Sequence, residues 1–490
     1  MFTFIGGIIL LIIGYFTYGK FVEKVFGVKD DRPTPALTKK DNVDYMPLKK
    51  TKNSLIELIS IAGVGPIFGP IMGALYGPVA FVWIVIGCIF AGAVHDYLTG
   101  MISIRNGGAH LPQLAGKFLG RFMKHIVNIF SILLLLLVGT VFVSSSATLI
   151  FDVINGKVAL TILIGIVFVY YILSTMLPID KIIGKLFPIF GILLLLSTIS
   201  LGIGLVVTQA PIPELSFTNI HPEEAPIFPL LFLVISCGAI SGFHATQSPI
   251  IARTTGREKE GRGIFYGMMI GEGIIAMVWA AAAMSLFDGP VSLNELINTV
   301  GTSGIVSEAA TMMFGSIIGT IVVISIIALP LSSGDTAFRS ARMVIADYFN
   351  IPQKKIIKRL MIALPLFAIS IVLSTMDFTL LWRYFSWANQ SLAVIALWVG
   401  AMYLFIGKRN YWIAFIPGIF MTYVVTAYIL NAPIGFRLPM DITYILSAII
   451  TISVILLFFK YARINRAKEF PMDEDLKEWT ENPAVAVPHC

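Results

Sequence analysis

The chain has few charged residues. Only 13% of its 490 residues are charged, whereas 57% are hydrophobic. A soluble domain carries roughly a quarter charged residues, so this composition excludes a soluble fold. Apolar residues instead form continuous runs of about 18–25 residues, the length at which an α-helix crosses a hydrocarbon core of about 30 Å. Strands of a membrane β-barrel would alternate apolar and polar residues. The sequence therefore predicts an all-α, polytopic membrane protein.

Cysteine and catalytic motifs are also scarce. The three cysteines, Cys88, Cys237 and Cys490, include no CxxC pair. We therefore expect no disulfide framework, no zinc or other metal site, and no cofactor. A Walker motif, HExxH and GxSxG do not occur in the sequence, which excludes an ATP-driven pump and a membrane hydrolase. The chain is not expected to be an enzyme.

The apolar runs predict about thirteen transmembrane helices. Their approximate bounds are residues 2–19, 54–75, 78–103, 124–150, 158–177, 186–208, 227–250, 263–287, 312–334, 357–375, 379–406, 411–431 and 441–460. All but Lys157, Arg383 and Arg437 of the 35 lysines and arginines then fall on one side of the membrane. The positive-inside rule assigns that side to the cytoplasm, so we expect the N-terminus outside and the C-terminus in the cytoplasm. The net charge of +7 is a topology signal, and no nucleic-acid partner is expected.

Glycine and proline interrupt two of these spans, at residues 61–70 and 236–249. Irregular backbone at membrane depth must be buried in protein or line a water-filled cavity. Paired interruptions of this kind point to the binding site of a secondary transporter, and close packing of helices through small residues is the alternative. The residues at the breaks predicted to bind substrate are Gly63, Gly65, Pro66, Gly69, Ser236, Gly238, Ser241, Gly242 and His244.

The two breaks enter the membrane from opposite faces. Each opens a set of five spans, 54–208 and 227–406, which is the plan of a LeuT-like 5+5 inverted repeat with a discontinuous first helix in each half. Residues 1–53 add an N-terminal helix and a basic cytoplasmic loop. Residues 407–460 add two helices, and 461–490 form a cytoplasmic tail. The outer loop 288–311 is either a short lid helix or a plain connector, and the basic loop 335–359, with Arg339 and Arg342, is expected to anchor the topology.

Several segments resemble the carbon starvation protein A (CstA) family. They are residues 32–36, 44–47, 62–70, 91–96, 237–244, 381–382 and 388–390. This resemblance, which runs in order over nearly the whole chain, implies an inner-membrane transporter of the amino acid–polyamine–organocation superfamily. The family is associated with peptide uptake during carbon starvation, and some relatives carry pyruvate with protons. Where relatives often have a His-His pair, this chain has Ile56-Glu57, so a role for that pair is not carried over.

Three polar positions inside the spans are candidates for ion coupling. Glu272 lies near the middle of an apolar span, where a carboxylate is costly and functional by default, although a structural hydrogen bond is the rival interpretation. His244 could bind substrate or carry a proton, or it could hold the break open by bonding a carbonyl. His95-Asp96 could form a gate or a proton relay, or a structural polar pair with a basic loop residue.

Two further pairs complete the predicted site. Ser332 and Ser333 occupy the position where hydroxyls would bind Na⁺, and serines bonded to their own helix are the alternative. Asn389 and Gln390 lie inside a later span, where their amides could contact a peptide backbone.

We therefore expect a secondary active nutrient importer that works by alternating access. The leading substrate is a short peptide, coupled to H⁺, with Na⁺ as the other possible coupling ion. A symporter of pyruvate or another small monocarboxylate with H⁺ is the alternative within this class, and a membrane-embedded sensor or channel is the alternative outside it. The partners expected are the small-molecule substrate and the lipid bilayer. The sequence does not separate peptide from pyruvate, nor does it give the oligomeric state.

Overall fold

The structure, a computed structural model, describes residues 1–41, 44–176, 183–353, 355–467 and 472–473. The first half contains α1 (Phe2–Phe16), α2 (Tyr18–Phe26), α3 (Pro35–Thr38), α4 (Lys50–Ala62), α5 (Gly65–Gly73), η1 (Ala74–Tyr76), α6 (Val79–Gly87), η2 (Cys88–Gly92), α7 (Ala93–Arg105), α8 (Leu111–Leu119), α9 (Arg121–Val153), α10 (Leu160–Met176) and α11 (Ile183–Val207). The second half contains α12 (Ile227–Val234), α13 (Gly242–Ala252), η3 (Glu258–Glu260), η4 (Arg262–Tyr266), α14 (Gly267–Leu286), α15 (Gly289–Tyr348), α16 (Ile356–Leu373), α17 (Phe378–Ile406), α18 (Trp412–Asn431) and α19 (Met440–Ala467). All these elements are helical, which confirms the predicted fold class.

The long helices have the composition of membrane spans. Among the described residues, ten helices are long and apolar enough to cross a membrane, or eleven if the bent pair α4–α5 counts as one span. The apolar helix at 160–175 is shorter, and α12 and α13 are each half the length of a span. Each of the thirteen predicted spans coincides with one or two of these helices, although the count of thirteen and the 5+5 division stay predictions.

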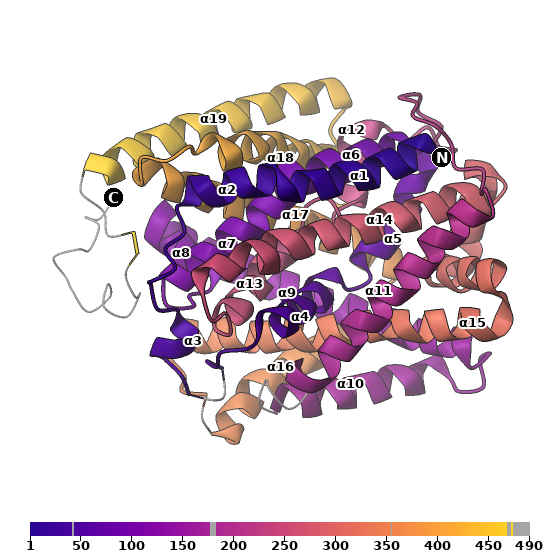
Figure 1. The fold of residues 1–490 in the computed structure, drawn as a ribbon, viewed down its shortest axis with the longest axis horizontal. Helices are drawn as coiled ribbons and strands as arrows, with labels where there is room; N and C mark the ends of the chain where they lie inside the picture. The colour runs from indigo at the N-terminus through magenta and orange to yellow at the C-terminus, as the bar shows by residue number, and fades with distance from the viewer. Residues whose placement is uncertain (42–43, 177–182, 354, 468–471, 474–490) are drawn as a thin grey trace.

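The helices lie side by side in one bundle (Figure 1). In this view α18 and α19 lie along one edge, α10 and α16 along the other, and the short helices α4, α5 and α13 lie between them. The interrupted helices are therefore surrounded by continuous ones. Helix α14 packs against α4 and α5, and α7 and α17 pack against α13, so other helices flank both breaks.

The first break has a simple local cause. Helix α4 ends at Ala62, and Gly63 then adopts φ +49°, a backbone conformation that side-chain-bearing residues rarely adopt. Helix α5 begins at Gly65 with Pro66 in its first turn, where helices tolerate a missing N–H. The axes of α4 and α5 differ by 47°. The predicted interruption is thus present at the predicted residues.

The second break is longer, because helix α12 ends at Val234 and α13 begins only at Gly242. Gly238, in the middle of the unwound segment, has φ +87°. Side chains from neighbouring helices bind the exposed backbone: Trp83 Nε1 donates to the Ile235 carbonyl at 3.2 Å. An unpaired buried backbone group costs about 1–3 kcal/mol, so these partners stabilise the break.

Helix α15 bears on two predicted segments: it favours a helix over a plain connector at 288–311, and it corrects the start of the predicted basic loop 335–359. Residues 289–311 are helical, and the helix breaks at Gly301 and Gly315, which have φ +70° and +73°. The helix then continues to Tyr348, so Arg339 and Arg342 lie within it and are each 2% exposed. Arg339 Nη2 donates to the Ser174 carbonyl at 2.9 Å. The interpretation of these arginines as part of a basic loop was wrong, because both are buried within α15, where Arg339 binds the Ser174 carbonyl and Arg342 binds the Gln353 side chain.

Candidate functional site

The two breaks meet in the centre of the bundle. A Cβ atom added at Gly65 would lie 2.3 Å from Cys237 Sγ, and one at Gly69 would lie 2.9 Å from the Val234 carbonyl oxygen. Contacts this close leave no room for a side chain on α5. Residues 61–71 and 235–255 are all buried. Segments that are about 170 residues apart in the chain therefore form one shared, solvent-excluded region, as the pairing of the breaks predicted.

Asn389 and Gln390 of α17 bind the unwound backbone of the second break. Asn389 Oδ1 accepts from the Phe243 N–H at 2.7 Å and from Ser241 Oγ at 3.1 Å. Gln390 Nε2 donates to the Ile240 carbonyl at 3.1 Å. The amides were expected to contact a peptide backbone, and in this structure they contact the protein's own backbone. Asn389 Nδ2 and Gln390 Oε1 are buried without a hydrogen-bond partner.

A chain of buried ionisable side chains links α7, α13 and α14. Asp96 accepts from His95 Nδ1 at 2.7 Å through Oδ1, and from His244 Nδ1 at 2.8 Å through Oδ2. An ionised carboxylate only accepts hydrogen bonds, so both imidazoles carry a proton on Nδ1. His95-Asp96 was considered a possible partner of a basic loop residue. The structure corrects this, because Asp96 pairs with His244 of the second break.

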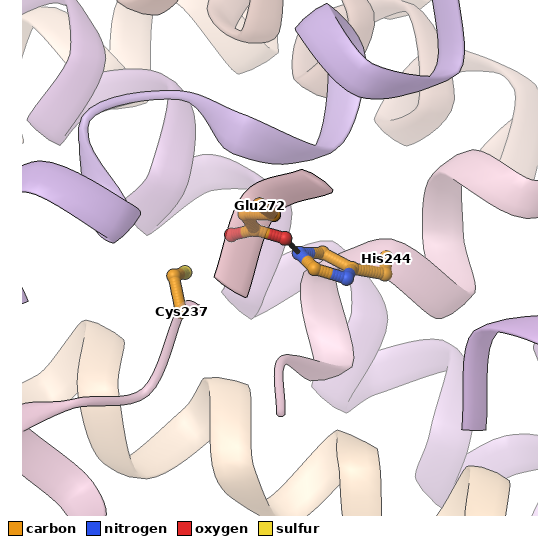
Figure 2. A group of neighbouring side chains, drawn as sticks. All are labelled: Cys237, His244 and Glu272. Carbon is orange, nitrogen blue, oxygen red and sulfur yellow. Dashed lines mark ion pairs between the residues drawn. The ribbon is translucent and has the colours of Figure 1, made fainter. Parts of the chain in front are cut away.

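Glu272 closes this chain at the second break. Its Oε1 accepts from the Gly238 N–H at 3.1 Å, and its Oε2 lies 3.3 Å from His244 Nε2. Figure 2 shows the imidazole of His244 facing the carboxylate of Glu272, with Cys237 on the other side of that carboxylate. Neither His244 Nε2 nor Glu272 Oε2 has a partner in good hydrogen-bond geometry. The lone pairs of these two atoms repel each other at this distance unless a proton sits on one of the atoms or a cation lies between them.

Glu57 is a functional candidate that the sequence analysis did not include. It lies in α4, five residues before the last residue of that helix, Ala62, and it is completely buried. Both of its carboxylate oxygens have no hydrogen-bond partner, and its charge interacts with those of Asp96, His244 and Glu272. The sequence signal was present: Glu57 is an acidic residue within an apolar run directly before a break. Compared with the relatives, it is also a departure from their His-His pair.

Ser332 and Ser333 of α15 contact the last turns of α4. Ser333 Oγ donates to the Ile59 carbonyl at 2.9 Å, and Ser332 Oγ donates to the carbonyl of Leu329 in its own helix at 2.8 Å. Ser333 therefore faces the first broken helix, Ser332 also bonds to its own helix as the alternative interpretation has it, and Na⁺ binding stays a prediction. Of the remaining predicted residues, Ser236 is buried at the break and its hydroxyl has no partner.

Another polar cluster lies away from the breaks. Arg105, at the end of α7, binds both oxygens of Glu258 at 2.9 and 3.0 Å and donates to Tyr403 Oη at 3.0 Å. Tyr403 Oη donates to Asp473 at 2.7 Å, and Arg32 donates to the other carboxylate oxygen of Asp473 at 2.9 Å. Burial would raise the pKa of Asp473, but these hydrogen bonds and the nearby arginines outweigh burial and lower the pKa below its usual value. We call these five residues the Asp473 cluster.

Comparison with known proteins places this site in a transporter. The family model described as "Carbon starvation protein CstA" matches residues 1–219 and 157–313. A Haemophilus influenzae "Uncharacterized membrane protein" is 49% identical, with 59% of this chain and 92% of that protein aligned. The Bacillus subtilis "Peptide transporter CstA" is 26% identical over 86% of this chain and 89% of its own length. The Escherichia coli "Pyruvate/proton symporter BtsT" is 24% identical, over 58% of this chain and 49% of its own.

Solved structures give the fold. MhsT in complex with L-phenylalanine superposes with a TM-score of 0.57 at 14% identity, over 85% of this chain and 99% of that one. A manganese transporter of Eremococcus coleocola gives 0.54 at 13% identity, over 88% and 99%. At such identities the likeness shows the fold alone, and it confirms the LeuT-like architecture.

Proposed function

Since this chain belongs to the carbon starvation protein CstA family of transporters, we propose that it takes up short peptides together with protons, by alternating access at the two broken helices. It is a multi-pass membrane transporter and not an enzyme. The observation that carries the proposal is the buried cluster of Glu57, Asp96, His95, His244 and Glu272 at the meeting point of the breaks.

A count of charges supports proton binding at this cluster. Three carboxylates face two imidazoles, so even two fully charged histidines would leave one negative charge without a counterion. An uncompensated buried charge is expensive in protein or lipid. At least one proton beyond those on the imidazoles therefore has to reside in the cluster when it is sealed from water. Glu272 and Glu57 carry the carboxylate oxygens without partners.

Glu272 couples this proton to substrate binding. In the structure it holds the Gly238 N–H, one of the backbone donors that the second break exposes. Protonation of Glu272 weakens that hydrogen bond and removes a negative charge from the break. The Gly238 amide and the positive end of α13, which begins at Gly242, then become available to a substrate carboxylate. Proton and substrate anion thus favour each other's binding, as symport requires.

Two unused groups favour a peptide as the substrate. Gln390 Oε1 is a buried acceptor and Asn389 Nδ2 a buried donor, and both lack partners. A peptide offers N–H and C=O groups that match such an amide pair, whereas pyruvate offers no donor. The name of the Bacillus subtilis relative, which aligns over most of this chain, supports the same substrate class. Pyruvate with H⁺ is the second candidate, because of the symporter relative in Escherichia coli.

Uptake into proteoliposomes tests the proposal. We expect labelled di- and tripeptides to accumulate when the outside is made acidic, and unlabelled peptide inside to stimulate their countertransport. Accumulation of pyruvate alone would replace the peptide proposal with the monocarboxylate one. A channel would show no countertransport.

Sodium coupling through Ser332 and Ser333 is a separate proposal. Their hydroxyls and the Ile59 carbonyl provide oxygen ligands between α15 and α4. Replacing Na⁺ with a large organic cation would abolish uptake if this site carries the coupling ion, and it would leave uptake intact if protons alone do.

We propose that the protein lies in the inner membrane, with its N-terminus outside and its C-terminus in the cytoplasm. The distribution of basic residues supports this orientation. A green fluorescent protein fused to the C-terminus is then expected to fluoresce, and alkaline phosphatase fused there is expected to be inactive. The opposite result would reverse the orientation.

A further inference from the structure

We propose that Cys237, His244 and Glu272 form a binding site for one divalent transition-metal ion of the Zn²⁺ type. One donor atom from each of these buried residues lies within 4.8 Å of the others. The three residues come from the unwound segment, from α13 and from α14 (Figure 2). Thiolate sulfur, imidazole nitrogen and carboxylate oxygen are the ligands that Zn²⁺ takes in proteins.

The geometry is close to that of a coordinated ion. Bonds of about 2.0–2.3 Å at tetrahedral angles place two ligand atoms roughly 3.3–3.8 Å apart. His244 Nε2 and Glu272 Oε2 already lie 3.3 Å apart. Cys237 Sγ makes a long contact of 3.5 Å to Ser241 Oγ and lies within 4.8 Å of both other donor atoms, so a modest movement of the sulfur would complete a three-ligand set.

The surroundings of His244 prepare it for a metal. Its Nδ1–H donates to Asp96 Oδ2 at 2.8 Å, which leaves Nε2 to face Glu272 and Cys237. A carboxylate that fixes the tautomer and orientation of a ligating histidine is the usual second-shell arrangement at zinc sites. His95 in turn donates to the other oxygen of Asp96 at 2.7 Å, so this orienting carboxylate is itself held in place.

Buried polar atoms without hydrogen-bond partners support the site independently of the ligand distances. Among the atoms without a hydrogen-bond partner are His244 Nε2, Glu272 Oε2 and both oxygens of Glu57. Buried polar atoms in native proteins are almost always satisfied. An ion between His244 and Glu272 would satisfy the first two, and Glu57, whose charge acts on both residues, would help to balance the ion's charge.

The spacing of the cysteines along the chain predicts no metal site. The ligands proposed here are dispersed over residues 237–272 and meet only because the second break unwinds beside α14. A proton and a metal ion would compete for the same atoms, since a metal binds the deprotonated ligands. The ion reaches the buried site when the breaks open, and this step alone rests on the proposed alternating access.

Cobalt provides a spectroscopic probe that reports sulfur ligation directly. The purified full chain is stripped with a chelator and titrated with Co²⁺ and then Zn²⁺. All proteins in this experiment, including the one called wild type, carry His489→Ala and Cys490→Ser, so that the terminal His-Cys pair contributes no ligand. We expect one Co²⁺ per chain, with a sulfur-to-cobalt charge-transfer band that Zn²⁺ abolishes. Cys237→Ser is expected to remove the band, and Cys88→Ser, which removes another buried thiol, is expected to retain it.

Binding constants test the remaining ligands. His244→Gln and Glu272→Gln are expected to weaken Zn²⁺ binding at least tenfold, and Asp96→Asn to weaken it about 10–100-fold, as second-shell changes do. Folding of each variant is checked by size-exclusion chromatography. Less than one metal ion per wild-type chain, or a band that survives Cys237→Ser, would overturn the site. If the wild-type preparation takes up substrate but binds no metal, the metal site fails and the transport proposal stands. If it binds metal but transports nothing, the transport proposal fails and the metal site stands.

Discussion

At the scale of single residues, the site is defined by which buried polar atoms have partners and which do not. Asp96 is fully engaged by two imidazoles, whereas Glu57 has no partner on either oxygen. In Asn389 and in Gln390, one atom of the side-chain amide is hydrogen-bonded and the other has no partner. Buried groups without partners are unstable unless something else binds them. The unpaired atoms therefore mark where protons, a cation or substrate would bind.

Asn389 provides a residue-scale test of the second break. Its replacement by alanine leaves the Phe243 N–H and the Ser241 hydroxyl without an acceptor. Each unsatisfied group costs about 1–3 kcal/mol, so we expect Asn389→Ala to lower the thermal midpoint in detergent by several degrees. The control is Asn298→Ala at an exposed position, and its stability is expected within about 0.5 kcal/mol of wild type. Equal midpoints for both variants would contradict this role of Asn389.

Much of the site could be predicted at this scale. Glu272, His244 and Asp96 were recognisable because ionisable residues inside apolar runs are rare and costly. Their pairing was not predictable, because the hydrogen bond between Asp96 and His244 joins residues 148 positions apart. Arg339 and Arg342 were misread for a related reason. A buried arginine near the end of a span looks like a topology anchor until its tertiary partners, such as the Ser174 carbonyl, are known.

At the scale of helices, glycine sets how closely the two breaks approach. Helix α5 presents Gly65 to Cys237 and Gly69 to Val234, at distances that admit no Cβ. The glycine and proline pattern predicted the position of both breaks. It did not predict that α12 and α13 would be separated by a long unwound segment, because that segment is stabilised by side chains of α14 and α17.

Gly65 tests this close contact. In Gly65→Ala the new methyl would lie 2.3 Å from Cys237 Sγ and 2.5 Å from Cys237 Cβ, so overpacking of about 1–3 kcal/mol is expected. We expect uptake to fall at least tenfold, and Cys237→Gly in the same chain to restore part of it. Gly6→Ala, where a Cβ would meet nothing within 4 Å, is the matched control. If Gly65→Ala transports normally, the breaks do not need this contact.

The Asp473 cluster ties a tail residue to α7 and α17. The pKa of Asp473 is lowered below the usual value of about 3.9. The ionised carboxylate of Asp473 therefore stabilises the contact between the tail and these helices. That stabilisation is fully present above about pH 4 and is lost as the pH falls through the lowered pKa. We expect Asp473→Asn to make the chain at residues 472–473 more sensitive to protease at pH 7, while acidification to about pH 5 leaves the wild type unchanged. Equal cleavage rates for the two proteins at pH 7 would contradict this role.

At the scale of the whole molecule, the structure is closed around the shared site. Every residue of the two breaks is buried, so substrate, proton and metal ion can enter only if helices move. The bundle places the interrupted helices between continuous ones (Figure 1), which allows the flanking helices to rock around a fixed centre. The charge pattern predicted the overall architecture because it reports topology directly. Conformation and substrate are not encoded in that pattern.

The most direct test of the account is proton-driven uptake by Glu272→Gln in proteoliposomes. The side chain keeps its size and one oxygen for the Gly238 N–H, but it cannot release a proton. We predict that the wild type and the exposed control Glu295→Gln accumulate labelled dipeptide when the outside is acidic. Glu272→Gln should only equilibrate the label and still exchange it for internal peptide. Accumulation by Glu272→Gln at the wild-type level would contradict proton coupling through the two broken helices.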